Sequence, residues 1–150
     1  MANSFISLDI HVIFSTKNRE NLIDIELQRR LWPFLGGIAK QNNMVAYAIG
    51  GIENHVHILL SIPATITVSK AMQLIKAGSS KWIHETFPGK ASFAWQTGYS
   101  AYSVSKSNRD KMIHYINTQE EHHRICTFEK EYIGYLNNSG LPYEEKYVWG

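Results

Sequence analysis

The chain is poor in the features that mark secreted, membrane-bound and nucleotide-driven proteins. Cys126 is the only cysteine among 150 residues, so no disulfide can form within the chain, and a reducing compartment is expected. Every apolar stretch has the length of a strand and falls short of the ~20 residues that span a membrane. No charged and then apolar signal segment opens the sequence, and no Gly-x4-Gly-Lys phosphate loop occurs in it. These absences predict a cytoplasmic protein that does not depend on nucleotide hydrolysis.

The chain also lacks a strong excess of charge, with 15 basic and 13 acidic side chains and a net charge of +2. The charge is nevertheless uneven. Residues 1–119 hold 12 basic and 7 acidic side chains, whereas residues 120–150 hold 3 basic and 6 acidic ones. The larger part therefore favours a polyanionic partner such as nucleic acid. A hydrophobic content of 44% argues for a folded domain.

The sequence contains no repeats, linkers or low-complexity tracts, so we expect one domain that spans residues 1–150. Hydrophobic periodicity and turn residues place its elements. We expect strands at 5–15, 44–52, 55–62 and 93–105, and helices at 25–38, 67–86, 108–124 and 127–137. Asp24 is a suitable N-cap for the first helix, whereas Pro33 and the pair Gly36-Gly37 predict a kink or break within it.

This order of elements is βαββαβ followed by two further helices, which predicts an α+β fold. It suits a ferredoxin-like antiparallel sheet that carries helices on one face, with the extra C-terminal helices added to it.

The most informative feature is the pair His55 and His57, which flank Val56 in the apolar run 52–62. Residues i and i+2 of a strand point to the same face, so both imidazoles project side by side. Polar rings on a sheet face need partners. The pair is therefore either two half-buried histidines bonded to neighbours or two-thirds of a metal site. A reactive metal site would also need a third ligand and a nucleophile.

Tyr115 and Gln119 are four residues apart, so they share one face of the expected helix, and His122 lies one turn further along that face. Taken singly, Tyr115 would be a core aromatic and Gln119 a solvated side chain. Together with the histidine pair they supply the missing parts. A metal bound by His55, His57 and Gln119 would place Tyr115 about one helical turn away.

Three further stretches accompany these pairs, at 11–19 (HVIFSTKNR), 95–99 (WQTGY) and 119–123 (QEEHH). In their order and spacing, the five resemble the motifs of the single-tyrosine HUH transposases. These are the small TnpA-type enzymes of the simplest bacterial insertion sequences, and transposases associated with repetitive extragenic palindromes are their relatives. In that family His55-Val56-His57 corresponds to the His-hydrophobe-His motif, and 115–119 (YINTQ) to the Tyr-Ile-x-x-Gln motif. The resemblance covers nearly the whole chain and implies the HUH nuclease fold.

The resemblance implies an enzyme that cuts and rejoins single-stranded DNA at transposon ends. Tyr115 would attack a phosphodiester and leave a 5′-phosphotyrosine and a free 3′-hydroxyl, and the 3′-hydroxyl of a second strand would then attack the phosphotyrosine. His55, His57 and Gln119 would hold a divalent metal that activates the scissile phosphate. We expect Mg²⁺ or Mn²⁺, with Mn²⁺ bound more tightly because imidazole nitrogen suits it better.

The residue that would accept the proton of Tyr115 is left open by the sequence. With a reference pKa of about 10, half-ionisation of a tyrosine at pH 7 needs a shift of about 3 units. The candidates for what supplies this shift are the nearness of the metal, a proton acceptor on the phosphate, His114 and His122. His122 and His123 would equally serve as solvated histidines that favour a helix C-terminus.

The resemblance also implies hairpin DNA at element ends as the partner, and a homodimer in which the tyrosine helix of either subunit completes the site. The side chains expected to contact DNA phosphates are basic: Lys17 and Arg19 in the first loop, and Lys76 and Lys81 on the second helix. Aromatic residues of the stretch 93–102 would stack on bases.

Three other classes remain open from the sequence. A non-catalytic module that binds single-stranded nucleic acid would need neither metal ligands nor Tyr115. A HUH replication initiator or relaxase usually carries a third histidine and a differently placed tyrosine, so Gln119 in the third place favours the transposase. A small metal-dependent hydrolase would release its product with water and form no covalent adduct with DNA.

Overall fold

A computed structural model describes residues 3–149 and confirms the α+β class, with one four-stranded antiparallel sheet in the order β2-β3-β1-β4. This is the strand order that a ferredoxin-like βαββαβ unit produces. The elements are β1 (Asp9–Ser15), η1 (Lys17–Arg19), α1 (Ile25–Gln41), β2 (Val45–Ile52), β3 (His55–Ser61), α2 (Val68–Thr86), η2 (Pro88–Lys90), β4 (Ser100–Val104), η3 (Lys106–Asn108), α3 (Arg109–Asn117), α4 (Gln119–His122), α5 (Phe128–Asn138) and α6 (Glu145–Val148).

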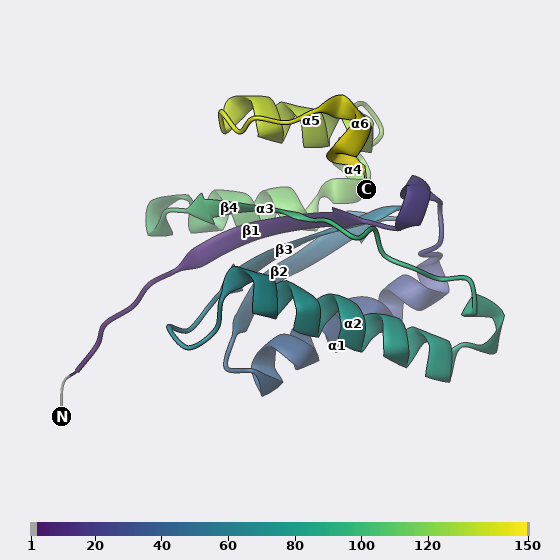
Figure 1. Cartoon of the computed structure of the whole chain (residues 1–150), viewed down its shortest axis with the longest axis horizontal. Coiled ribbons are helices and arrows are strands. Elements are labelled where there is room, and N and C mark those ends of the chain that lie inside the picture. The colour runs from purple at the N-terminus through teal and green to yellow at the C-terminus, as the bar shows by residue number, and fades with distance from the viewer. Residues whose placement is uncertain (1–2, 150) are drawn as a thin grey trace.

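The helices cover both faces of the sheet (Figure 1). Helices α1 and α2, which complete the βαββαβ unit, lie together on one face, as predicted. The C-terminal helices α3 to α5 lie on the opposite face, so the sheet is the middle layer of three. The one-turn helix α6 was not predicted. Among residues 3–149, no helix is long and apolar enough to cross a membrane.

The alternation of side chains on the two central strands decides what each face of the sheet carries. On β1, Ile10, Val12 and Phe14 point to α1 and α2 and belong to the main hydrophobic core. The intervening His11 and Ile13 point to the opposite face, where Ile13 packs with apolar residues of α5. The same alternation on β3 sends Val56, Ile58 and Leu60 into the main core. Its two histidines therefore face the C-terminal helices.

Two predicted strands are shorter than expected because their hydrogen-bonding partners end. Strand β1 begins at Asp9 rather than at residue 5, since Asp9 already pairs with the last residues of both β3 and β4. Strand β4 begins at Ser100 rather than at residue 93. In the stretch before it, Phe93 and Trp95 are buried in the main core, and Trp95 forms only an isolated bridge with Thr16.

Helix α1 runs without interruption through Pro33 and Gly36-Gly37, so the predicted break is wrong. The Asp24 side chain accepts a hydrogen bond of 2.8 Å from the Leu27 amide and caps the helix as predicted. A buried stripe along the helix packs on the sheet and outweighs the local cost of the proline. This stripe consists of Leu27, Leu31, Leu35, Ile38 and Ala39.

The single helix expected from 108 to 124 is divided into α3 and α4 at Thr118. Thr118 has non-helical dihedral angles (φ −112°, ψ 26°). Its hydroxyl donates to the His114 carbonyl at 2.9 Å, and its amide donates to the same carbonyl at 3.1 Å. A hydroxyl that bonds to the preceding turn in this way competes with the regular helix pattern. The break lies between Tyr115 and Gln119 and sets their relative direction.

Helix α3 lies directly on β2 because position 50 has no side chain. A Cβ atom added at Gly50 would lie 2.1 Å from the carbonyl oxygen of Ile116 on α3. This is backbone contact, which no side-chain rotation can relieve. Gly50 also pairs with His57 across the sheet. The glycine therefore fixes how closely the helix that carries Tyr115 approaches the strands that carry the histidines.

We predict that Gly50→Ala lowers the free energy of unfolding by about 1–3 kcal/mol, because α3 must move away from β2. Urea unfolding measures the change. The matched control is Gly37→Ala on α1, where an added Cβ meets nothing within 4 Å. Alanine there should stabilise the helix by about 0.5–1 kcal/mol. Equal effects of the two substitutions would contradict this account of Gly50.

Candidate active site and metal centre

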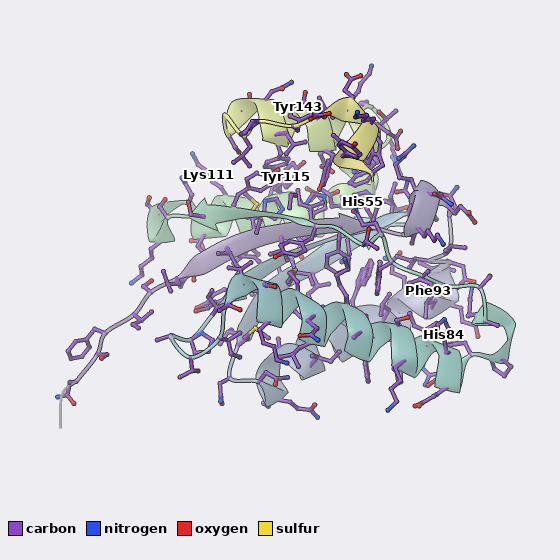
Figure 2. The ribbon with its side chains drawn as sticks, in the orientation of Figure 1. His55, His84, Phe93, Lys111, Tyr115 and Tyr143 are labelled. Carbon is purple, nitrogen blue, oxygen red and sulfur yellow. The ribbon has the colours of Figure 1, made fainter. Side chains whose placement is uncertain are left out.

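The two histidines of β3 lie buried between the sheet and the C-terminal helices, with side chains that are 0% exposed. Their ring centroids are 5.1 Å apart, so the predicted side-by-side placement is present. Figure 2 shows His55 and Tyr115 in this layer, on the side of the sheet that faces the C-terminal helices. Strand alternation alone brings His55 and His57 to this face.

In each histidine the outer ring nitrogen, Nδ1, lies close to a neighbouring side chain, and the inner ring nitrogen, Nε2, points to a common centre. His55 Nδ1 lies 2.9 Å from Asn54 Oδ1, and His57 Nδ1 lies 2.8 Å from His11 Nε2. The Nε2 atoms of both rings remain directed into the layer. Metal-binding histidines are commonly held in this way, with the second ring nitrogen bonded to an outer group that fixes orientation and tautomer.

Gln119 joins the two histidines, as the sequence predicted. Its side chain is almost fully buried, and its Oε1 atom lies 3.0 Å from His55 Nε2. The break at Thr118 places Gln119 at the first position of α4. The three side chains predicted to hold a metal therefore converge within one chain.

Two further donors, His123 and Glu131, complete the cluster and were not predicted as ligands. Glu131 on α5 places Oε1 at 2.9 Å from His57 Nε2 and 3.6 Å from His55 Nε2. His123 Nε2 lies 2.9 Å from Gln119 Oε1 and 3.3 Å from Glu131 Oε1. The donor atoms of His55, His57, His123 and Glu131 lie within 4.8 Å of one another, a group that can hold a metal ion.

The sequence does carry a signal for Glu131. It lies on the stripe of α5 whose other members, Phe128, Tyr132 and Leu136, are buried. A carboxylate on an apolar stripe requires a buried partner. For His123 the signal is weaker, since its place after the helix end fits a solvated residue equally well.

Tyr115 points its hydroxyl to the same cluster from α3. The hydroxyl donates a hydrogen bond to Glu131 Oε2, and His122 Nε2 lies 3.4 Å away. The Tyr115 ring centroid is 5.8 Å from that of His57. Burial and the adjacent carboxylate together raise the pKa of Tyr115. The tyrosine is therefore protonated and oriented, whereas His114 is exposed on α3.

His11 is a member of the site that sequence reasoning named only as part of a motif. It is fully buried and stacks on His57 at a centroid distance of 5.0 Å. Burial first, and then the charge of His57, lower the pKa of His11 to about 3. The available signal was its position on β1, out of phase with the apolar residues that face the core.

At the remaining titratable groups, burial and contacts with charged or hydrogen-bonding neighbours shift the pKa in opposite directions. Burial is the largest cause that lowers the pKa of His55 and of His57. Burial alone would raise the pKa of Glu131, but hydrogen bonds from His123, His57 and Tyr115 lower it overall. Burial opposes the charged form of His123, yet its contacts with Glu131 raise its pKa. The centre thus holds an ionised carboxylate beside neutral His55 and His57, and the same carboxylate favours the charged form of His123.

The residues predicted to contact DNA lie on η1 and α2 and differ in their surroundings. Arg19 lies 3.7 Å from Glu129 and 4.3 Å from the centre of the Trp149 ring. Lys76 donates to the carbonyls of residues 97 and 98 at 3.1 and 2.7 Å, and burial lowers its pKa to about 8. Lys17 and Lys81 are exposed. Their contacts with DNA stay predictions.

Within the aromatic stretch 93–102, base stacking is ruled out for Phe93 and Trp95. These two side chains are 2% and 8% exposed and form part of the main core. Tyr99 is 36% exposed.

The arrangement of a His-x-His pair, a glutamine and a half-buried tyrosine on this fold defines a class of protein. The family model for the IS200-like transposases matches residues 4–119. The chain therefore belongs to the IS200-like transposase family.

Two relatives show the extent of the similarity. The transposase for insertion sequence element IS200 of Salmonella typhimurium is 29% identical over 121 residues, which cover 77% of this chain and 78% of the relative. The ISDra2 transposase TnpA of Deinococcus radiodurans is 24% identical over 119 residues, which cover 76% and 85% of the two chains.

Solved structures share the fold. A crystal structure from Deinococcus radiodurans R1, of a protein assigned as a transposase, has a TM-score of 0.64 and is 24% identical. The similarity covers 79% of this chain and 95% of that one. A REP-associated tyrosine transposase bound to a REP hairpin has a TM-score of 0.60 and is 14% identical, over 82% and 73% of the two chains.

The neutral buried histidines predict that acid destabilises the protein. The pKa values of His11, His55 and His57 are lowered in the folded chain, so only the unfolded chain gains these protons near pH 6.5. The free energy of unfolding should therefore fall as the pH decreases from 7 to 5. Each such histidine contributes up to about 1.4 kcal/mol per pH unit, and His123, with a raised pKa, opposes this fall only above about pH 6.5, since below it the unfolded chain carries that proton as well.

Urea unfolding of chelator-treated protein at several pH values measures this dependence. A His11→Gln variant should show a shallower pH dependence, by about one proton, because one titrating group is removed. Stability that stayed constant or increased over the same pH range would contradict the assignment of neutral buried rings.

Proposed function

We propose that this transposase cleaves and rejoins single-stranded DNA with Tyr115 as nucleophile and with assistance from a divalent metal. The observation that carries the proposal is the placement of the Tyr115 hydroxyl beside a cluster that can hold a metal, built from His55, His57 and Gln119 with their neighbours. A nucleophile next to a Lewis-acid site is the arrangement that phosphoryl transfer needs.

The reaction exchanges one phosphoester for another. The Tyr115 oxygen forms a bond to phosphorus, the bond from phosphorus to the 3′-oxygen breaks, and the 3′-oxygen leaves as a hydroxyl. The 3′-hydroxyl of a second strand then attacks the phosphotyrosine, restores a phosphodiester and releases Tyr115. Each step conserves the number of phosphoester bonds, so no nucleotide cofactor is required.

The residues present fit a divalent ion. The outer nitrogens of His55 and His57 are bonded to Asn54 and His11, which leaves their Nε2 atoms for coordination beside the amide oxygen of Gln119. A bound ion supplies Lewis-acid polarisation of the scissile phosphate and stabilises charge on the leaving oxygen. We propose Mg²⁺ or Mn²⁺, with tighter binding of Mn²⁺ because two donors are imidazole nitrogens.

The chain's own residues orient the nucleophile and receive its proton. Glu131 Oε2 accepts the hydrogen bond of Tyr115 and so fixes the direction of the hydroxyl. His122 Nε2 lies 3.1 Å from the same oxygen and 3.4 Å from the Tyr115 hydroxyl. Of the two histidines that the sequence offered as acceptors, His122 is therefore the one within reach. A proton that leaves Tyr115 can pass to it directly or through Glu131.

We propose that the partner is hairpin DNA at the ends of a mobile element. Residues 1–150 would act on this DNA as one domain, in the cytoplasm. Support comes from the REP-associated transposase of similar fold, whose solved structure contains a REP hairpin. The exposed Lys17 is the simplest phosphate contact, whereas Lys81 lies 4.0 Å from Glu85 at the surface, and Arg19 and Lys76 would first have to leave their present partners.

Tyr115→Phe should abolish cleavage and the covalent adduct, because the attacking oxygen is removed while the ring still packs. The measurement is a denaturing gel of labelled single-stranded hairpin DNA incubated with the protein and Mn²⁺. Tyr143→Phe is the matched control, since that hydroxyl donates to Asn137 at 2.9 Å on the surface, away from the site. It should leave the adduct unchanged. An adduct formed by Tyr115→Phe would refute the assignment of the nucleophile.

The same gel tests the ligands. His57→Ala should eliminate the adduct, and Gln119→Ala should reduce it less completely, because the amide is one of two oxygen donors in the cluster. Cleavage by His57→Ala at the wild-type rate in Mg²⁺ would remove the metal site from the mechanism. A non-catalytic binding module would bind the hairpin without any adduct, and a hydrolase would cut it without one.

We also propose a homodimer with two sites, each formed in cis. Support for the cis arrangement is that His57 and Tyr115 of one chain lie together. Support for the dimer is that β4 is an edge strand, which can pair with a second copy. A Tyr115→Phe chain co-expressed with a His57→Ala chain should therefore give inactive mixed dimers. Recovered activity would place the tyrosine helix in trans, and a monomer at micromolar concentration with DNA would refute the dimer.

A further inference from the structure

We propose that helix α5 supplies Glu131, together with His123 from the turn after α4, as additional ligands of the metal site. The inference rests on the proposed metal-assisted function and extends its ligand set beyond His55, His57 and Gln119. Both added residues lie outside residues 4–119, the part of the chain that the family model matches. The ion would then bind helix α5 directly to the sheet (Figure 1).

The separations between the donor atoms have the size that ligands of one ion require. Two ligands at right angles around an ion with bonds of ~2.1 Å lie ~3.0 Å apart, and tetrahedral ligands lie ~3.4 Å apart. The separation from Glu131 Oε1 to His57 Nε2 is 2.9 Å, and to His123 Nε2 it is 3.3 Å. The separations of Gln119 Oε1 from His55 Nε2 and from His123 Nε2 are 3.0 and 2.9 Å. All four match neighbouring positions around one centre.

The hydrogen-bonding pattern also calls for a cation at this centre. His123 Nδ1 lies 2.6 Å from the Cys126 carbonyl oxygen, which can only accept, so this nitrogen carries the proton whenever the ring is in the neutral form that can coordinate a metal. His55 Nδ1 faces Asn54 Oδ1 in the same way. The Nε2 atoms of both rings are then lone-pair acceptors. They face the oxygens of Gln119 and Glu131, which are acceptors too.

The orientation of Gln119 fits this arrangement. Its Nε2 atom donates to Glu131 Oε2 at 3.3 Å, which leaves Oε1 directed at the histidines. When both rings are neutral, Gln119 Oε1 and the Nε2 atoms of His55 and His123 are acceptors that face one another in a buried space without a donor between them, which is unfavourable. A divalent ion among them satisfies every one.

Glu131 connects the ion to the nucleophile because its two oxygens face different groups. Oε1 lies among the ring nitrogens, and Oε2 accepts the hydrogen bond of Tyr115. When Oε1 coordinates, the carboxylate is held, and with it the direction of the Tyr115 hydroxyl. Five protein donors around an octahedral ion would leave one position for a phosphate oxygen. The donor set of three imidazoles, one amide and one carboxylate favours Mn²⁺ over Mg²⁺.

The test is a titration of the full chain with Mn²⁺, followed by the electron paramagnetic resonance signal of free Mn²⁺. Glu131→Gln keeps the shape and removes the charged ligand, and it should raise the Mn²⁺ dissociation constant at least about tenfold. The matched control is Glu129→Gln on the same helix, where the carboxylate lies at the surface, 3.7 Å from Arg19, and is not one of the proposed donors. It should bind Mn²⁺ within a factor of two of the wild type. Thermal unfolding in chelator shows that both variants are folded.

Three outcomes are distinguishable. A tenfold loss in Glu131→Gln, with a normal Glu129→Gln, supports the added ligand. Affinity within twofold of the wild type in Glu131→Gln, while His57→Ala does not bind, overturns the inference and leaves the proposed function intact. Normal binding by His57→Ala overturns both, since the ion would then lie elsewhere.

A second measurement needs no variant and covers the case in which Glu131→Gln does not fold. If α5 coordinates the ion, Mn²⁺ should slow amide hydrogen exchange in α5 of the wild-type protein, because opening the helix then costs the binding energy as well. Exchange in helix α2, which lies on the opposite face of the sheet, should change little by comparison. An α5 whose exchange rate does not respond to saturating Mn²⁺ overturns the inference.

Discussion

The burial of two imidazoles on a sheet face is the constraint from which the rest of this side of the molecule follows. His55 and His57 lie on β3 with no exposed surface, and each ring carries two nitrogens that need partners. Neighbouring side chains take the outer nitrogens, and the inner nitrogens meet groups from the C-terminal helices. The opposite face of the same strand carries only apolar residues and packs on α1 and α2. Strand β3 therefore has the hydrophobic core on one face and the candidate active site on the other.

The backbone is adjusted at two points so that the C-terminal helices reach these rings. Gly50 lets α3 lie against β2 in backbone contact, which brings Tyr115 close to His57. Thr118 ends α3 and starts α4 in a new direction, which delivers Gln119 to His55. A side chain at the first point would push α3, and with it the nucleophile, away from the sheet that carries the histidines.

The membership of the chain in the IS200-like transposase family explains why these particular residues occur together. The family match ends at residue 119, whereas the buried site continues into α5 through Glu131. The tail beyond residue 119 is also the acidic part of the chain. Most of its carboxylates are solvated, and Glu131 is the one that the fold buries. The ring nitrogens around Glu131 stabilise its negative charge, whereas an isolated buried carboxylate would destabilise the fold.

The sequence by itself determined the strand order and the placement of the histidine pair. Strand alternation at β3 and the Asp24 cap are local rules, so they could be predicted without knowing what packs against them. The sequence also indicated Tyr115 and Gln119, because the motif that contains them can be read without the structure. The continuous helix expected to carry both residues is divided at Thr118. The sequence overestimated the lengths of β1 and β4, because the end of a strand depends on where its hydrogen-bonding partners end.

Only the tertiary structure decided which distant groups meet the histidines. His11 reaches His57 from a neighbouring strand, and Glu131 reaches it from a helix 74 residues further along the chain. Neither contact follows from a local pattern, because each depends on the register of two strands or on the docking of a whole helix. The continuity of α1 through Pro33 was decided in the same way, by the packing of its buried stripe on the sheet. Local sequence sets the face to which a side chain points, and packing of the whole chain sets what it meets there.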